Sequence, residues 1–198
     1  MMTIFNTANR QFSYETFLEL ATALHEEHKT TGDNQSEEYL HYSKLNLQRM
    51  KRWNKTYELP EDFKAQLQSV QPQHWFVITE AWCGDSAQNL PVIAKIAAAS
   101  EGRITLKIVL RDENPDIINQ YLTNGSKSIP ILAAFDQSGQ FLFRWGPRPV
   151  AAQALMTAWK SDPNPKSFED FELEMHNWYH QNKGIDTLKE LSALLFKG

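Results

Sequence analysis

The stretch that most constrains the fold of this chain is Trp82-Cys83-Gly84-Asp85-Ser86, which contains the only cysteine of the 198 residues. An apolar run over residues 75–78 precedes it, and residues with helical apolar spacing follow it. This pattern predicts a strand over residues 75–80, a tight turn, and a helix over residues 85–99. The thiol of Cys83 then lies at a strand-to-helix turn, where the free N–H groups and the dipole of the helix favour its anion.

The composition is that of an ordinary globular chain with 41% hydrophobic and 22% charged residues, which is enough to build a core. The net charge of −4 does not favour nucleic acid as a partner. A single cysteine excludes an internal disulfide and a cysteine-rich zinc site. His176 and His180 lie four residues apart on an expected helix, but aromatic residues separate them and no HExxH pattern is present. We therefore expect no metal and no cofactor.

The N-terminal residues favour neither secretion nor a membrane. They lack the basic segment and following apolar run of a secretory signal. No stretch of the chain approaches the roughly 18 apolar residues of a membrane span. We therefore expect a cytoplasmic protein without a membrane partner, because a lone cysteine stays a thiol in that reducing compartment.

Three segments with different patterns follow one another along the chain. Residues 1–73 predict a helical N-terminal extension, in which Ser13 and Ser36 cap the first two helices. Residues 74–160 predict elements in the order β-α-β-α-β-β-α, which implies an α/β domain with a mixed sheet and helices on both faces. Residues 161–198 predict a helical C-terminal extension.

Within the central segment the pattern places each element after the first helix. The expected elements are a strand over 104–110, a helix from Asn114-Pro115 to about Leu122, strands over 129–135 and 141–145 joined by a hairpin turn, and a helix that ends near Lys160.

This central segment resembles the thioredoxin superfamily. Trp82-Cys83-Gly84 is similar to the start of the WCGPC motif of that family, and Pro91 lies where the family has a proline in the active-site helix. Asp112-Glu113-Asn114-Pro115 is similar to the DxNP entry to the next helix, and Ser128-Ile129-Pro130 is similar to the GIP segment. Gly146 matches the glycine after the last hairpin. The resemblance implies a thioredoxin-like three-layer fold with helical extensions at both ends.

Three positions depart from the family pattern. Ser86 replaces the second cysteine, Asp85 replaces the proline of the motif, and Val77 replaces the buried aspartate that serves proton transfer to the second thiol. A site without a resolving thiol has little need of that aspartate, so the losses at positions 77 and 86 agree with each other. The resemblance therefore implies a monothiol site.

The predicted catalytic residues are Cys83 and Ser86, because the Ser86 hydroxyl can donate a hydrogen bond to the sulfur. The carboxylate of Asp85 opposes the anion, so we expect a Cys83 pKa that is lowered, but not to an extreme, from the usual value of about 8.5. The resemblance implies a cis peptide before Pro130 and a substrate groove. The predicted substrate-binding residues are Trp82, Gly84, Asp85, Ile129, Pro130 and Gly146.

A single nucleophilic thiol allows several functions. The first hypothesis is a redox protein that forms mixed disulfides with a protein or low-molecular-weight thiol or disulfide, which an external thiol then resolves. A thiol of this kind can also be oxidised to a sulfenic acid and act as a sensor. The main alternative is a non-enzymatic binding or adaptor module with the thioredoxin fold. A third, weaker alternative is an iron–sulfur carrier, because Cys83-Gly84-Asp85-Ser86 is similar to the CGFS motif of monothiol glutaredoxins.

Overall fold

The computed structural model of this chain describes residues 2–196. The chain forms two compact units, residues 1–147 and residues 148–198, which we call the sheet unit and the helical unit. The division expected from the sequence, after residues 73 and 160, stays a prediction. The candidate site lies in the sheet unit, and each unit is described by itself.

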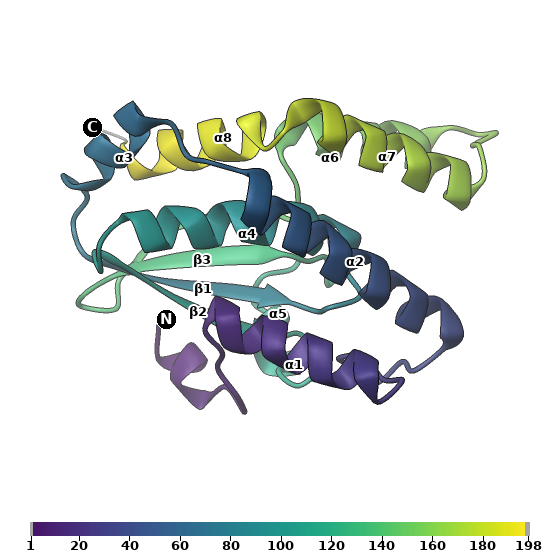
Figure 1. Cartoon of the computed structure of the whole chain (residues 1–198), viewed down its shortest axis with the longest axis horizontal. Coiled ribbons are helices and arrows are strands. Elements are labelled where there is room, and N and C mark those ends of the chain that lie inside the picture. Colours follow the sequence, from purple (N-terminus) through teal and green to yellow (C-terminus); the bar gives the residue numbers. More distant parts are fainter. Residues whose placement is uncertain (1, 197–198) are drawn as a thin grey trace. The chain divides into compact units, whose positions relative to one another are not determined.

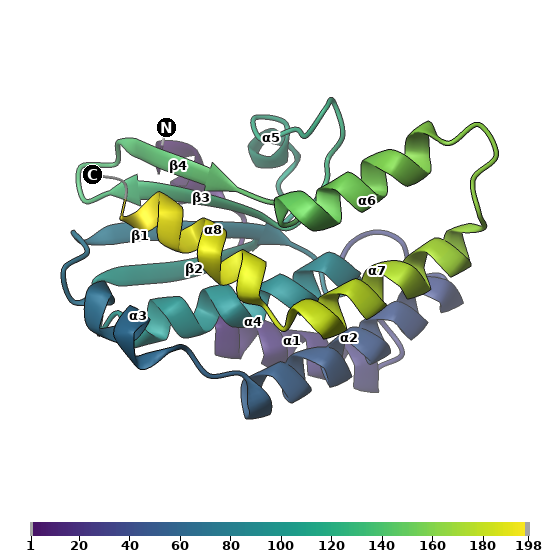
Figure 2. The ribbon, with the colours of Figure 1, turned by 90° about the horizontal axis from the view of Figure 1, so that it is seen from above.

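A four-stranded mixed sheet forms the centre of the sheet unit, with the strand order β2-β1-β3-β4 (Figure 2). The strands are β1 (Gln73–Thr79), β2 (Ile104–Leu110), β3 (Ile131–Asp136) and β4 (Phe141–Trp145). β1 pairs with β2 in parallel and with β3 antiparallel, and β3 pairs with β4 antiparallel. The predicted mixed α/β arrangement is therefore confirmed, and β1 carries the candidate site at its carboxyl end.

The sheet unit also contains helices, two of which begin directly after the serine caps that the sequence predicts. They are the 3-10 helix η1 (Met2–Thr7) and the α-helices α1 (Tyr14–Glu26), α2 (Glu37–Thr56), α3 (Glu61–Leu67), α4 (Gly84–Ala99) and α5 (Pro115–Ile118). The Ser13 hydroxyl accepts from the Thr16 N–H at 3.2 Å, and the Ser36 hydroxyl accepts from the Tyr39 N–H at 3.4 Å. Each bond satisfies one of the free N–H groups in the first turn of its helix.

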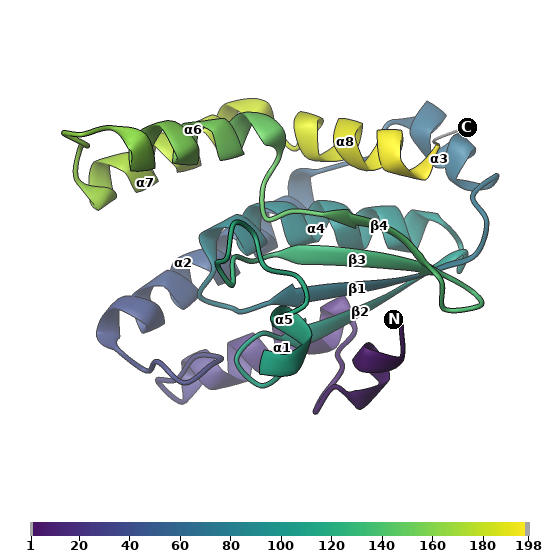
Figure 3. The same ribbon diagram turned by 180° about the vertical axis from the view of Figure 1, so that it is seen from behind.

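The sheet unit has three layers. α4 covers one face of the sheet, and α2 and α3 pack against α4 (Figure 1). η1 and α5 cover the opposite face (Figure 3). The chain before α1 lies along the edge of the sheet, where Phe12 exchanges backbone hydrogen bonds of 2.9 and 2.8 Å with Ile108 of β2. This bridge pairs backbone groups that an exposed edge strand would leave open.

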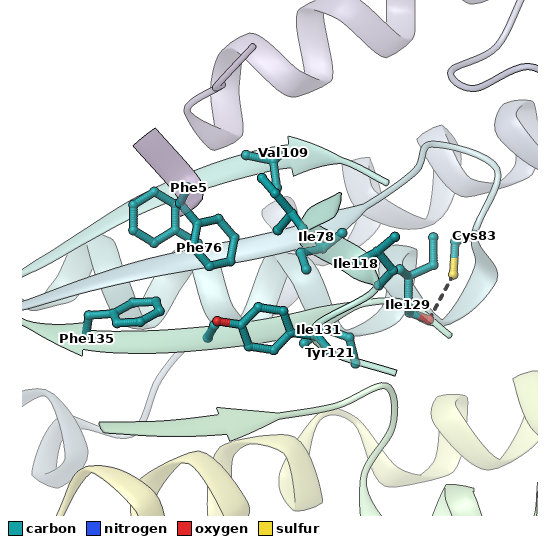
Figure 4. Close-up of a cluster of buried hydrophobic side chains, with 12 residues drawn as sticks. Phe5, Phe76, Ile78, Cys83, Val109, Ile118, Tyr121, Ile129, Ile131 and Phe135 are labelled. Carbon is teal, nitrogen blue, oxygen red and sulfur yellow. Dashed lines mark hydrogen bonds between the residues drawn. The ribbon is translucent and has the colours of Figure 1, made fainter. Parts of the chain in front are cut away.

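The layer under η1 and α5 contains an apolar cluster that extends to the candidate site (Figure 4). Phe5 stacks on Phe76 of β1 with a ring-centroid distance of 4.4 Å. At the other end of the same cluster lie Ile118, Ile129 and Cys83. The thiol is thus part of the wall of the core.

α5 is shorter than the sequence predicts. It ends at Ile118 and not near Leu122. The N–H groups of Gln120 and Tyr121 donate to the carbonyls of Ile117 and Ile118 at 3.0 and 2.9 Å, in tight turns that do not continue the helix. Tyr121 stays in the buried cluster with Ile118, so tertiary packing has replaced the last helical turn.

The helical unit contains α6 (Val150–Ser161), α7 (Phe168–Asn182) and α8 (Ile185–Leu195). α6 and α7 lie side by side in Figures 1 and 2. Trp159 of α6 stacks on Phe171 of α7 with ring centroids 4.7 Å apart, and Met175 and Tyr179 are buried beside them. Within residues 2–196, no helix has the length and apolar character that crossing a bilayer requires.

Candidate functional site

Cys83 is the N-cap residue of α4, directly after the turn that follows β1. Its backbone N–H donates to the carbonyl of Glu80 at 3.3 Å, and its carbonyl accepts from the Ala87 N–H at 3.1 Å. The backbone of Cys83 is extended, with φ −80° and ψ 116°. The first backbone N–H groups of α4 therefore belong to the residues directly after Cys83. These groups and the positive end of the helix dipole favour a thiolate at Cys83.

The sulfur of Cys83 faces the loop before β3. Sγ donates a hydrogen bond to the carbonyl oxygen of Ile129, with 3.4 Å between the two atoms (Figure 4). Cys83 is 8% exposed. The resting thiol is thus held against a backbone carbonyl, close to the surface of the apolar cluster.

The loop before β3 and the loop after β4 pack against each other through their backbones. The peptide bonds before Pro130 and Pro147 are both cis. Gly146 has φ +108°, and a Cβ atom there would lie 2.3 Å from the Pro130 carbonyl oxygen. Position 146 therefore requires glycine, both for its backbone conformation and for the close approach. The structure brings Cys83, Ile129, Pro130 and Gly146 into one neighbourhood.

Ser86 lies in the first turn of α4 and is 2% exposed. Its oxygen accepts a hydrogen bond of 2.6 Å from the hydroxyl of Thr79, the last residue of β1. This bond ties the helix to the strand beneath it. The expected donation from Ser86 to the sulfur of Cys83 stays a prediction.

Gly84 and Asp85 form the start of α4, and both are partly buried. The backbone carbonyl of Asp85 accepts from the Asn89 amide at 2.8 Å. The carboxyl group of Asp85 lies in the first turn of the helix, where a negative charge is favourable. Asp85 and a Cys83 thiolate therefore compete for the same helix terminus.

Trp82 lies between charged and aromatic neighbours. The guanidinium group of Arg111 lies over its indole ring, 4.6 Å from the ring centroid, and the ring of Tyr39 lies 4.8 Å away. Arg111 also donates to the carboxylate of Asp112 at 2.7 Å. The indole Nε1 is buried and has no hydrogen-bond partner among the described residues. The expected place of Trp82 beside the groove stays a prediction.

Side chains from the segment before α2 and from α2 hold the turn before Cys83. The Thr31 hydroxyl accepts from the Ala81 N–H at 2.8 Å, and the Asn46 amide of α2 donates to the Ala81 carbonyl at 3.0 Å. All three residues are buried. A buried turn has to satisfy its backbone polar groups, and here two side chains from the N-terminal segment do so.

Glu80 is a group that the sequence analysis missed. Its side chain is fully buried, and Oε1 accepts from the Asp112 N–H at 2.9 Å. Burial raises the pKa of this carboxyl group to about 7, although the Thr31 hydroxyl and the Asp112 N–H favour its ionised form. The signal in the sequence was a carboxylate at the end of an apolar strand, three residues before the cysteine.

The site therefore holds a thiol at the N-terminus of a helix, beside a backbone carbonyl of the loop before β3. Such a thiol can ionise and attack a disulfide. No three His, Cys, Asp or Glu side chains within residues 2–196 come together in a way that could hold a metal ion.

The sequence of this chain is similar to those of known thioredoxins. The sequence model of a family described as Thioredoxin matches residues 32–160. Thioredoxin 1 of Nostoc sp. is 43% identical over 54 residues, which are 27% of this chain and 48% of that protein. The match thus spans about half of the length of that relative.

Two solved structures are similar over nearly the whole chain. A protein of unknown function from Pseudomonas aeruginosa has a TM-score of 0.55 and 17% identity, with 92% of this chain and 96% of that chain covered. An HIV epitope scaffold has a TM-score of 0.54 and 18% identity, with coverages of 92% and 97%. At this identity the two structures indicate the fold alone. Together with the family match, they confirm the predicted thioredoxin-like fold.

Proposed function

Because the chain belongs to the thioredoxin family, we propose that it is a monothiol redox protein that forms mixed disulfides through Cys83. Its partners in this proposal are protein or low-molecular-weight thiols and disulfides. A reducing, cytoplasmic location goes with the proposal, since the thiol has to be kept reduced between reactions.

The reaction has two exchanges. The thiolate of Cys83 attacks one sulfur of a substrate disulfide, a new S–S bond forms at Cys83, and the other substrate sulfur leaves as a thiolate. An external thiolate then attacks the substrate sulfur of this mixed disulfide and forms a disulfide with it. Cys83 leaves as a thiolate, so no net oxidation of the protein occurs.

The observation that carries the proposal is the position of Cys83 as the N-cap of α4, with its sulfur 3.4 Å from the Ile129 carbonyl. The helix terminus favours the thiolate. The thiolate loses the hydrogen bond to Ile129, because it has no proton to donate. The Ile129 carbonyl then becomes available to a backbone N–H of an extended substrate.

A binding module without exchange is the second candidate, and one observation favours it. Cys83 is a buried residue, and its thiol donates its proton to the carbonyl of Ile129. A small buried thiol of this kind can be inert. Partner binding would then survive the substitution Cys83→Ser.

The test uses glutathione disulfide as the probe and intact-mass spectrometry as the readout. The folded protein is expected to gain a single glutathione, and an excess of reduced glutathione is expected to remove it. The variant Cys83→Ser is expected to gain none, whereas Ser69→Ala, at an exposed serine outside the site, keeps the thiol and serves as the control. An adduct that forms only after unfolding would reject the redox proposal and leave the binding module.

A further inference from the structure

Glu80 is a buried carboxyl group with one unused oxygen. Its side chain is fully buried, Oε1 accepts from the Asp112 N–H, and Oε2 has no hydrogen-bond partner among residues 2–196. A buried polar atom without a partner is uncommon in folded proteins and calls for an explanation. A carboxylate with an unpaired oxygen is costly there, whereas the neutral acid is much less so.

Glu80 and Cys83 are the two ends of one tight turn. The Cys83 N–H donates to the Glu80 carbonyl at 3.3 Å, and residues joined in this way have Cα atoms less than about 7 Å apart. Both residues are buried. The two side chains thus belong to one buried turn, where salt screens the effect of a charge on its neighbours only weakly.

The charged groups that face Glu80 come from the loop after β2. Asp112 disfavours a second negative charge, and Arg111 favours it. Arg111 is itself paired with Asp112 at 2.7 Å, so the two charges largely offset each other at Glu80. The loop before α2 contributes only the uncharged hydroxyl of Thr31. Within its own turn, the one other titratable group is the thiol of Cys83.

We propose that Glu80 is a positioning residue for Cys83, and that the proton on its carboxyl group governs how readily the Cys83 thiol ionises. A neutral Glu80 adds no charge to the turn, so it does not oppose a thiolate at Cys83. An ionised Glu80 adds a like charge and disfavours the thiolate. The burial that raises the pKa of Glu80 to about 7 puts this switch in the neutral range.

The coupling is reciprocal, because two interacting sites titrate as a pair. A Cys83 thiolate raises the pKa of Glu80, and an ionised Glu80 raises the pKa of Cys83. The inference deepens the proposed function and rests on it for its biological meaning, because the ionisation of Cys83 sets the rate of disulfide exchange.

The test is the rate of Cys83 alkylation by iodoacetamide against pH, in the folded protein and in Glu80→Gln. The neutral amide keeps the size of the side chain and removes the charge. The alkylation midpoint is expected to fall by about one pH unit in the variant, which is a roughly tenfold larger thiolate fraction below the midpoint. Glu113→Gln removes a carboxylate from the loop after β2 and is expected to leave the midpoint unchanged. An unchanged midpoint in Glu80→Gln would overturn the inference.

A second measurement needs no variant and covers the case in which Glu80→Gln does not fold. The titration of the Glu80 carboxyl carbon is followed by NMR in the free protein and after alkylation of Cys83. The alkylated sulfur carries no charge, so the Glu80 titration is expected to become a single step at lower pH. Identical titrations in the two samples would contradict the coupling.

The outcomes separate this inference from the proposed function. If glutathione adds to Cys83 but the midpoint is the same in Glu80→Gln, only the coupling fails. If the midpoint shifts but no adduct forms in the folded protein, the redox function fails and the coupling stands.

Discussion

The backbone of Gly146 lies against the carbonyl oxygen of Pro130, so closely that a Cβ atom at position 146 would be 2.3 Å from that oxygen. Gly146 follows β4 and Pro130 precedes β3, and these two strands pair directly. The contact therefore fixes Pro130 and the residue directly before it, Ile129. The carbonyl of Ile129 accepts the hydrogen bond from Cys83.

The substitution Gly146→Ala is expected to destabilise the protein by about 3 kcal/mol, since it combines an unfavourable φ with a backbone clash. Gly125→Ala is the matched control, because Gly125 has φ +77° and no atom within 4 Å of the added Cβ. The control is expected to cost about 1–2 kcal/mol. Urea denaturation measures both, and equal costs would show that the contact with Pro130 is not rigid.

A second prediction concerns the anchor of the turn before Cys83. Thr31→Val keeps the shape of the side chain but leaves the buried Ala81 N–H without its acceptor at 2.8 Å. The expected loss is about 1–3 kcal/mol of the free energy of unfolding. Thr56→Val is the control, because the exposed Thr56 hydroxyl donates only to the Arg52 carbonyl of its own helix. A loss in Thr31→Val no larger than in the control would remove the N-terminal segment as the support of the site.

Local signals were enough to predict most of the elements. The strands Ile104–Leu110 and Phe141–Trp145 have the predicted bounds, because alternation and a hairpin turn define them without help from the rest of the chain. Ser13 and Ser36 cap their helices as predicted, since capping depends on neighbours three residues away.

The contacts that build the site were not predictable in this way. Glu80 meets Thr31 and Asp112, and Ser86 meets Thr79, through packing between segments. α5 also ended early, because Tyr121 is held in the core cluster in place of a further helical turn. A periodic pattern predicts which face of an element is buried. It does not predict which polar group of another segment a buried side chain contacts.

The stability of the protein is expected to fall as pH rises through the range in which Glu80 ionises. The pKa of Glu80 is about 7 in the folded protein, against an ordinary value of 4.5. Between these values the folded state holds a proton that the unfolded state has released, so folding is favoured at the acid end of this window. The free energy of unfolding is expected to drop by about 3 kcal/mol across the window and to level off above it.

Glu80→Gln lacks this proton and isolates the effect from all other titrating groups. The difference in unfolding free energy between the wild type and Glu80→Gln, from urea denaturation, is expected to change by about 3 kcal/mol between pH of about 4.5 and about 8. A difference that is the same at both pH values would mean that Glu80 has an ordinary pKa.

The last prediction converts the site into a dithiol. Ser86→Cys places a second thiol three residues after Cys83, at the start of α4. Cα atoms with this spacing in a helix lie about 5–5.5 Å apart, within the range of about 4.4–6.8 Å that a disulfide spans. Mild oxidation of the folded variant is expected to form an internal disulfide, detected by intact mass and by protection of both thiols from alkylation.

Two control variants test the geometry behind this expectation. Ala94→Cys puts the second thiol about 16 Å along the helix axis, too far for a disulfide, so it is expected to keep two free thiols. Ser86→Cys also deprives the Thr79 hydroxyl of its oxygen acceptor, and sulfur accepts hydrogen bonds only weakly. The double variant Thr79→Val with Ser86→Cys is therefore expected to be more stable than Ser86→Cys and to oxidise as well. If neither variant with Cys at position 86 closes a disulfide, the first turn of α4 does not present residues 83 and 86 to each other.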